Sequence, residues 1–185
     1  MHPVIGVLLQ VVLALWIVAG FADWWSHRRT QIERTSGIAE SLCHWLLLIQ
    51  MGTAIVLCIA FRPNLLLLTL LLFLWVSHQT TTFLELRWVA PVREITPAEQ
   101  MTHSFLEILP VAGILLLSIP VVEQTLLGYP VEWTMEHRAI ADIHWQTGIW
   151  PLLIAACLVF NGLAYMEETW RCLRWRQRRR HKPSN

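Results

Sequence analysis

Long runs of apolar residues restrict, more than any other feature, how this 185-residue chain can fold. A helix needs about 20 mostly apolar residues to cross the hydrocarbon core of a bilayer. Five segments reach or approach that length, at about residues 3–24, 38–60, 64–86, 100–122 and 147–166. The sequence therefore predicts an all-α, polytopic membrane helix bundle, in which residues 1–170 form one transmembrane domain and residues 171–185 a basic tail.

The basic residues divide unevenly between the two sides that five spans would create. Twelve of the fourteen Lys and Arg residues follow the first, third or fifth run, and only Arg62 and Arg138 fall on the other side. Since Lys and Arg concentrate in cytoplasmic loops, this asymmetry predicts an N-terminus outside and a C-terminus in the cytoplasm. The first run has no basic residues before it, so we interpret it as a membrane span and not as a cleaved signal. We expect a multi-pass protein of a bacterial inner (plasma) membrane.

The tail "WRCLRWRQRRRHK" interleaves Trp and Arg after the last run. Such a pattern can indicate nucleic-acid binding. Trp at a bilayer interface, with Arg reaching towards anionic headgroups, explains it more simply. We therefore predict membrane lipids, and no nucleic acid, as partners of the tail.

The loop between the fourth and fifth apolar runs contains the stretch "EWTMEHRAIADIHW", residues 132–145, which predicts a short amphipathic helix. His137 and His144 are seven residues apart and would share one of its faces. An ordinary interfacial helix accounts for them as well as a site does, so their role stays open.

Ionisable residues gather at one depth of the predicted bundle. Four of the five helices bring His and carboxylate groups to their cytoplasmic ends, whereas the outer halves contain almost none. Ionisable residues inside membrane spans are costly and usually mark function. We therefore predict a metal site at the cytoplasmic end, formed by Asp23, His27, Glu40, His44, His78, Glu99, His103 and Glu107, with Glu33, Thr82 and Glu85 in a supporting layer.

Three pairs in this set place an acid four residues before a histidine: Asp23 and His27, Glu40 and His44, Glu99 and His103. That spacing puts an oxygen donor and a nitrogen donor on one helix face, about 6 Å apart along the axis. Mixed carboxylate and imidazole donors suit iron, manganese or zinc. Di-iron carboxylate bundles follow the same logic with Glu and Glu-x-x-His from four helices.

Several of these residues also have a simpler explanation. Thr96, Pro97 and Glu99 form a capping box, which by itself accounts for Glu99. Glu40 can be a first-turn acid that the helix dipole favours. Glu107 lies two turns deeper than Glu99, where capping does not apply, so His103 and Glu107 are the members of this stripe best interpreted as ligands.

The remaining candidates have alternatives of their own. His78 is surrounded by Ser and Thr and can belong to a polar seam without metal. Asp23 and His27 lie near the interface, where water can solvate them. Glu85 can pair with Arg87 or Arg93, and Glu33 can be an ordinary loop acid.

The Glu-x-x-x-His pairs at 40–44 and 99–103 resemble, at motif level only, the sites of integral-membrane di-iron proteins; no family is a close match. The His-x-x-x-His and His-x-x-His-His boxes of the fatty-acid desaturase superfamily are missing. The resemblance implies two iron ions that activate dioxygen and oxidise a lipid-soluble substrate. Electrons would come from an external donor, because no flavin or dinucleotide fingerprint occurs. An oligomer is compatible with the sequence.

Two other functions compete with this prediction. "GIAESLCHWL" and "WVSHQTT" resemble early motifs of membrane zinc hydrolases of the ceramidase and adiponectin-receptor type, which implies three His ligands and a carboxylate base. A b-type haem carrier would use paired histidines as axial ligands, but it leaves the acid before each histidine unexplained. The four cysteines form no CxxC pair. Eight candidate ligands exceed what one zinc needs, so we favour two metals.

Overall fold

The structure, a computed structural model, describes residues 3–137 and 149–180. Its helices are α1 (Pro3–Thr30), the short 3₁₀ helix η1 (Ile32–Arg34), α2 (Ile38–Ala60), α3 (Leu65–Val89), α4 (Pro97–Leu126), α5 (Trp150–Cys157), the π-helical segment Leu158–Gly162 and α6 (Leu163–Arg180). In the described ranges the one extended pairing is an isolated bridge between Phe61 and His137. The fold is therefore all-α.

Five helices are long and apolar enough to cross a membrane, which confirms that part of the prediction; α5, the π-helical segment and α6 form the fifth. The second span has the predicted bounds. The first and fifth helices continue beyond their apolar runs, to Thr30 and Arg180. The apolar run stops where charged residues begin, but the helix continues because Arg, Glu and Gln are good helix formers.

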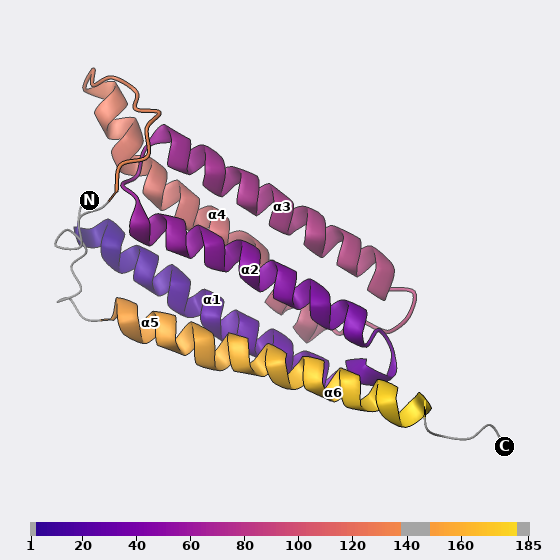
Figure 1. Ribbon diagram of the computed structural model, residues 1–185. Coiled ribbons are helices and arrows are strands. Elements are labelled where there is room, and N and C mark those ends of the chain that lie inside the picture. Colours follow the sequence, from indigo (N-terminus) through magenta and orange to yellow (C-terminus); the bar gives the residue numbers. More distant parts are fainter. Residues whose placement is uncertain (1–2, 138–148, 181–185) are drawn as a thin grey trace.

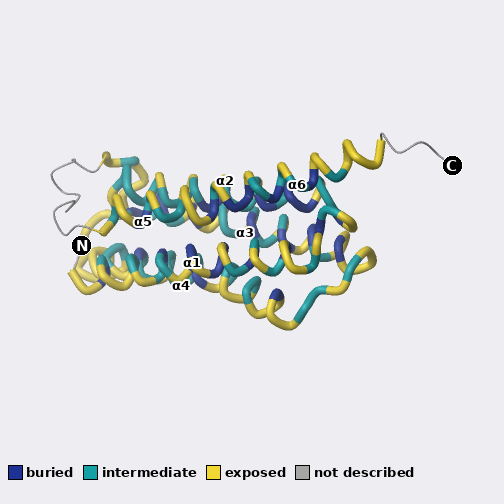
Figure 2. Tube along the Cα trace, turned by 90° about the horizontal axis from the view of Figure 1, so that it is seen from below, coloured by how far each residue is buried: buried dark blue, intermediate teal, exposed yellow. Residues whose placement is uncertain are grey.

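The helices pack in pairs around a common interior (Figure 1). α1 packs along α4 and α2 along α3, while the fifth helix lies against α1 and α2. Apolar cores fill the interior, one built around Leu13, Trp16 and Met51 and another around Leu67, Leu71 and Leu117. Exposed residues, many of them large and apolar, cover the outer surface (Figure 2). An apolar exterior of this extent is suited to lipid and not to water.

Side-chain caps begin two of the helices. The Thr96 hydroxyl accepts from the Glu99 N–H at 3.2 Å, and Pro97 is the first helical residue, so the predicted cap is present. Asn64 caps α3 by accepting from the Leu67 N–H at 2.8 Å. These caps satisfy backbone groups that a helix start leaves without partners.

The predicted amphipathic helix at 132–145 is wrong for residues 132–137, which are not helical. This segment lies against the α2–α3 turn instead. The Arg62 N–H donates to the Glu136 carbonyl at 3.0 Å, and the Asn64 amide donates to the Thr134 carbonyl at 2.7 Å. Carbonyls held by another segment are not available to a local helix. His144 lies outside the described residues.

Replacing Asn64 tests this junction. Asn64→Ala removes both the α3 cap and the bond to Thr134, so we expect the protein to lose about 1–3 kcal/mol of stability. Asn64→Asp keeps the acceptor and loses only the donor, so its loss should be smaller. Thermal unfolding in detergent measures both. Equal stability of the alanine variant and the wild type would contradict the assigned role.

Candidate metal centre

Buried polar side chains from all five long apolar helices meet at one end of the bundle. α1, α3 and the fifth helix end there, and α2 and α4 begin there. Each pair of successive helices runs in opposite directions, so these ends lie at a common level (Figure 1). The side chains concerned are nearly all buried: Asp23, His27, Glu40, His44, Glu85, Glu99 and Glu168, with His103 slightly more exposed.

His27 is at the centre of this group and has no exposed surface. Its Nδ1 lies 3.6 Å from Asp23 Oδ2 and 3.4 Å from Glu168 Oε2. Its Nε2 lies 3.2 Å from Glu99 Oε1 and 3.8 Å from Glu40 Oε1. One imidazole thus faces four carboxylates but can form only one direct hydrogen bond through each ring nitrogen.

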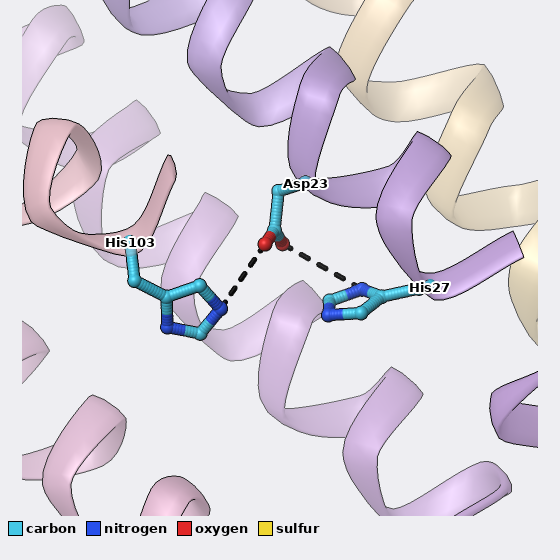
Figure 3. A group of neighbouring side chains, drawn as sticks. All are labelled: Asp23, His27 and His103. Carbon is cyan, nitrogen blue, oxygen red and sulfur yellow. Dashed lines mark ion pairs between the residues drawn. The ribbon is translucent and has the colours of Figure 1, made fainter. Parts of the chain in front are cut away.

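Two further histidines complete the group. The His44 ring stacks on the His27 ring with centroids 4.4 Å apart, while its Nδ1 lies 2.7 Å from Glu168 and its Nε2 3.0 Å from Glu85. His103 Nε2 lies 3.0 Å from Asp23 Oδ1. Figure 3 shows the Asp23 carboxylate between His103 of α4 and His27 of its own helix. We call these three histidines and the five carboxylates Asp23, Glu40, Glu85, Glu99 and Glu168 the polar cluster.

Two sets of three donors in the polar cluster lie close enough together that each could hold a metal ion after small side-chain shifts. Asp23, His27 and His103 form one set, and His27, Glu40 and His44 form the other, each with ligand atoms within 4.8 Å of one another. Donors bound at about 2.1 Å to one ion lie about 3.0–3.5 Å apart, as edges of a tetrahedron or octahedron. The contacts of 3.4, 3.6 and 3.8 Å around His27 are too long for good hydrogen bonds. Hydrogen bonding alone therefore does not account for the arrangement.

The polar cluster contains more acidic than basic side chains, so its charges need to be balanced. Its five carboxylates are all buried, and one guanidinium, that of Arg93, reaches them with a side chain only 5% exposed. If every carboxylate is ionised, four negative charges remain after pairing with Arg93. Buried charges must be paired or bind metal. Either protonated histidines or bound cations must supply the balance.

Arg93 closes the cluster from the loop between α3 and α4. Its guanidinium donates to both Glu40 and Glu99, with Nη1 2.9 Å from Glu99 Oε2 and Nε 3.3 Å from Glu40 Oε2. Burial by itself would lower the pKa of Arg93, but the hydrogen bonds to Glu99 and Glu40 outweigh it and raise the pKa above its usual value. The Ser36 hydroxyl also donates to Glu40. Both carboxylates are therefore held in fixed positions.

Four of the predicted residues lie around the polar cluster without joining these contacts. His78, Thr82 and Glu107 line a small cavity beside it. The Thr82 hydroxyl donates to the His78 carbonyl at 3.1 Å, and His78 Nδ1 lies 3.4 Å from Gln79 Oε1. Among the described residues no ion pair involves Glu107. Glu33 pairs with Arg171 of α6.

Sequence reasoning missed Glu168 and gave Arg93 no role in the site. Glu168 follows the predicted end of the fifth span at residue 166, in a stretch rich in Trp and Arg, so hydropathy gives no reason to place it inside the bundle. One signal could have found it. Asn161, Tyr165 and Glu168 are spaced four and three residues apart, which puts them on one helix face, and all three are buried. Glu85, predicted to support the site, contacts His44 directly.

Comparisons with models of protein families, with characterised proteins and with solved structures found no significant match. The class of protein is therefore defined by its own fold and site: a five-helix bundle of membrane-spanning type with a buried histidine–carboxylate cluster at one end.

Replacing Arg93 tests the charge balance. Arg93→Met leaves Glu40 and Glu99 without their cation, so we expect a loss of about 3–5 kcal/mol in stability. Arg93→Lys restores one charge and should recover part of it. Arg87→Met, at an exposed position in the same region, should change stability by less than about 0.5 kcal/mol. Similar unfolding temperatures for the two Met variants would contradict this role of Arg93.

Proposed function

We propose that this protein is a membrane-embedded dinuclear metal oxidoreductase or oxygenase, with iron as the metal and a lipid-soluble substrate. The observation that carries the proposal is the polar cluster itself. Two donor sets share His27, and the buried carboxylates exceed the available guanidinium by four charges. Two divalent cations would balance that excess.

The number of donors supports two ions and not one. Three histidines and five carboxylates offer more ligand atoms than a single tetrahedral or octahedral ion can use. Carboxylates can end on one ion or bridge two, as they do in di-iron bundles. Arg93 and Ser36 would hold Glu40 and Glu99 ready for this, as outer partners of ligands do in metal sites.

The donor chemistry favours iron. Imidazole and carboxylate together suit iron and manganese, and no cysteine belongs to the polar cluster. Bound iron would supply dioxygen reduction and the oxidation of substrate. The protein's own groups would balance its charge, fix its position and keep the site dry. Electrons would come from an external donor.

The competing functions have less support. The same donors could hold zinc for hydrolysis, but a single zinc would leave two of the four excess negative charges without a cation. Axial ligation of haem needs two ring nitrogens that point at the iron from opposite faces of the porphyrin. His27 and His44 are stacked face to face at 4.4 Å, and their ring nitrogens face carboxylates.

Metal analysis with matched variants tests the proposal. Purified protein should contain about two irons per chain and show no Soret band. Glu168→Ala should lose most of this metal, because Glu168 lies between His27 and His44. Glu167→Ala is the matched control, since that neighbour is partly exposed and pairs with Arg28. Iron retained equally in both variants, zinc alone, or a Soret band would each contradict the proposal.

The orientation is a second part of the proposal: the polar cluster faces the cytoplasm of a bacterial inner membrane. The basic residues near this end support it, and several stack on Trp rings as interfacial residues do, such as Arg174 on Trp170 and Arg29 on Trp25.

Reporter fusions check this orientation. A reporter after residue 185 that is active only in the cytoplasm should be active, and a reporter active only in the periplasm should be inactive there. The reverse pattern would place the cluster on the outer face.

A further inference from the structure

An apolar cavity lies inside the bundle, on the side of the polar cluster that faces the membrane centre. Its volume is about 150 Å³, and it is partly open to the exterior of the bundle. Leu13 of α1, Met51 and Ile55 of α2, and Gly113 and Ile114 of α4 are among the residues that line it. Trp16 at its edge is seven residues before Asp23, or about 10 Å along the helix. We call this space the apolar chamber.

A second, smaller cavity of about 30 Å³ lies between the apolar chamber and the polar cluster. Trp16 lines both spaces, and Asp23, His44 and His103 line the smaller one. The smaller cavity, here called the polar antechamber, therefore touches members of both proposed donor sets. None of the described residues that line it is Lys or Arg.

Asn161 is a buried polar residue of the polar antechamber whose side chain has no hydrogen-bond partner. Its side chain is 1% exposed, lines this cavity, and has no hydrogen-bond partner for either its oxygen or its nitrogen. The buried Trp16 indole N–H likewise has none. A buried polar group without a partner costs about 1–3 kcal/mol, so these two groups are available to bind a polar atom that enters the antechamber.

The local backbone presents Asn161 to this cavity. It lies in the π-helical segment Leu158–Gly162, and such insertions often occur at functional sites. Its amide packs on Gly20 of α1, where a Cβ would lie only 2.7 Å from Asn161 Nδ2. Glycine at position 20 therefore makes room for the amide.

We propose that the apolar chamber and the polar antechamber together bind one substrate, an uncharged single-chain lipid with a hydroxyl or carbonyl group. Its chain occupies the apolar chamber and continues through the opening, since a cavity of this size holds about a benzene-sized group. Its oxygen bonds to Asn161 and Trp16, beside Asp23 and His103. A carboxylate or phosphate headgroup is disfavoured because the antechamber offers acids and no Lys or Arg. This inference names the substrate class of the proposed enzyme and so rests on that proposal.

Photolabelling tests the inference without need of turnover. Full-length protein in lipid nanodiscs is labelled with 1-dodecanol that carries a diazirine near the middle of its chain, and labelled peptides are mapped. Labelling should fall on chamber residues such as Met51 and Ile114. Unmodified 1-dodecanol should compete about tenfold better than dodecane or dodecanoate, as one buried hydrogen bond allows.

Point variants test separately the binding of the oxygen in the polar antechamber and of the chain in the apolar chamber. Asn161→Leu and Trp16→Phe should each reduce the preference for dodecanol over dodecane, and the double variant should abolish it, while labelling persists. Gly113→Leu should block labelling, because a Cβ there meets only Val12 at 3.9 Å and a longer side chain extends into the chamber. Gly52→Leu, at a glycine with open space that lines neither cavity, is the matched control. Unfolding temperature and metal content are measured for each variant.

Three results would overturn the inference: equal competition by dodecane and dodecanol, stronger competition by dodecanoate, or labelling unchanged in a folded Gly113→Leu variant. These outcomes are distinct from failure of the proposed function. Protein that binds dodecanol in the chamber but contains no metal would contradict the enzyme proposal alone. Protein with two irons and no chamber labelling would contradict the substrate inference alone.

Discussion

Burial of five carboxylates in an apolar bundle is the constraint on which the rest of this structure depends. Ionised groups taken from water into low dielectric cost several kcal/mol each unless they are paired. Asp23, Glu40, Glu85, Glu99 and Glu168 share three histidines and one arginine. Protonated histidines can balance the charge only while they keep their protons. The two divalent cations that we propose would balance it at any pH and would use ring nitrogens as ligands.

The fold meets part of this constraint by placing two of the carboxylates, Glu40 and Glu99, in the first turns of α2 and α4. The N-terminus of α4 presents Glu99 within its own capped first turn, where the helix dipole favours an anion. Thr96 thus caps the backbone N–H of Glu99, while the Glu99 carboxylate faces His27 and Arg93. Beyond the polar cluster the interior becomes apolar, and the apolar chamber lies there.

Much of the candidate site could be predicted from spacing. Acid and histidine four residues apart identified the inward faces of α1, α2 and α4, and these faces do meet around His27. Spacing did not show which residues further along a helix still face the polar cluster, because that depends on how neighbouring helices cross. Glu107, two turns along the same stripe from Glu99, lines the antechamber, because a helix face turns gradually relative to a partner that it crosses. Glu168 was missed because hydropathy ends before the helix does.

By itself, the sequence determined five helices long and apolar enough to span a membrane and the position of each charged group along them, because hydropathy depends on position along the chain and the rise per residue is constant. Only the tertiary structure decided which side chains converge. Rotation of each helix about its axis is fixed by packing against its neighbours, and the loop between α3 and α4 had to fold back to bring Arg93 onto Glu40 and Glu99. The pairing of Asn161 with Gly20 likewise depends on contact between the first and fifth helices, which no local pattern records.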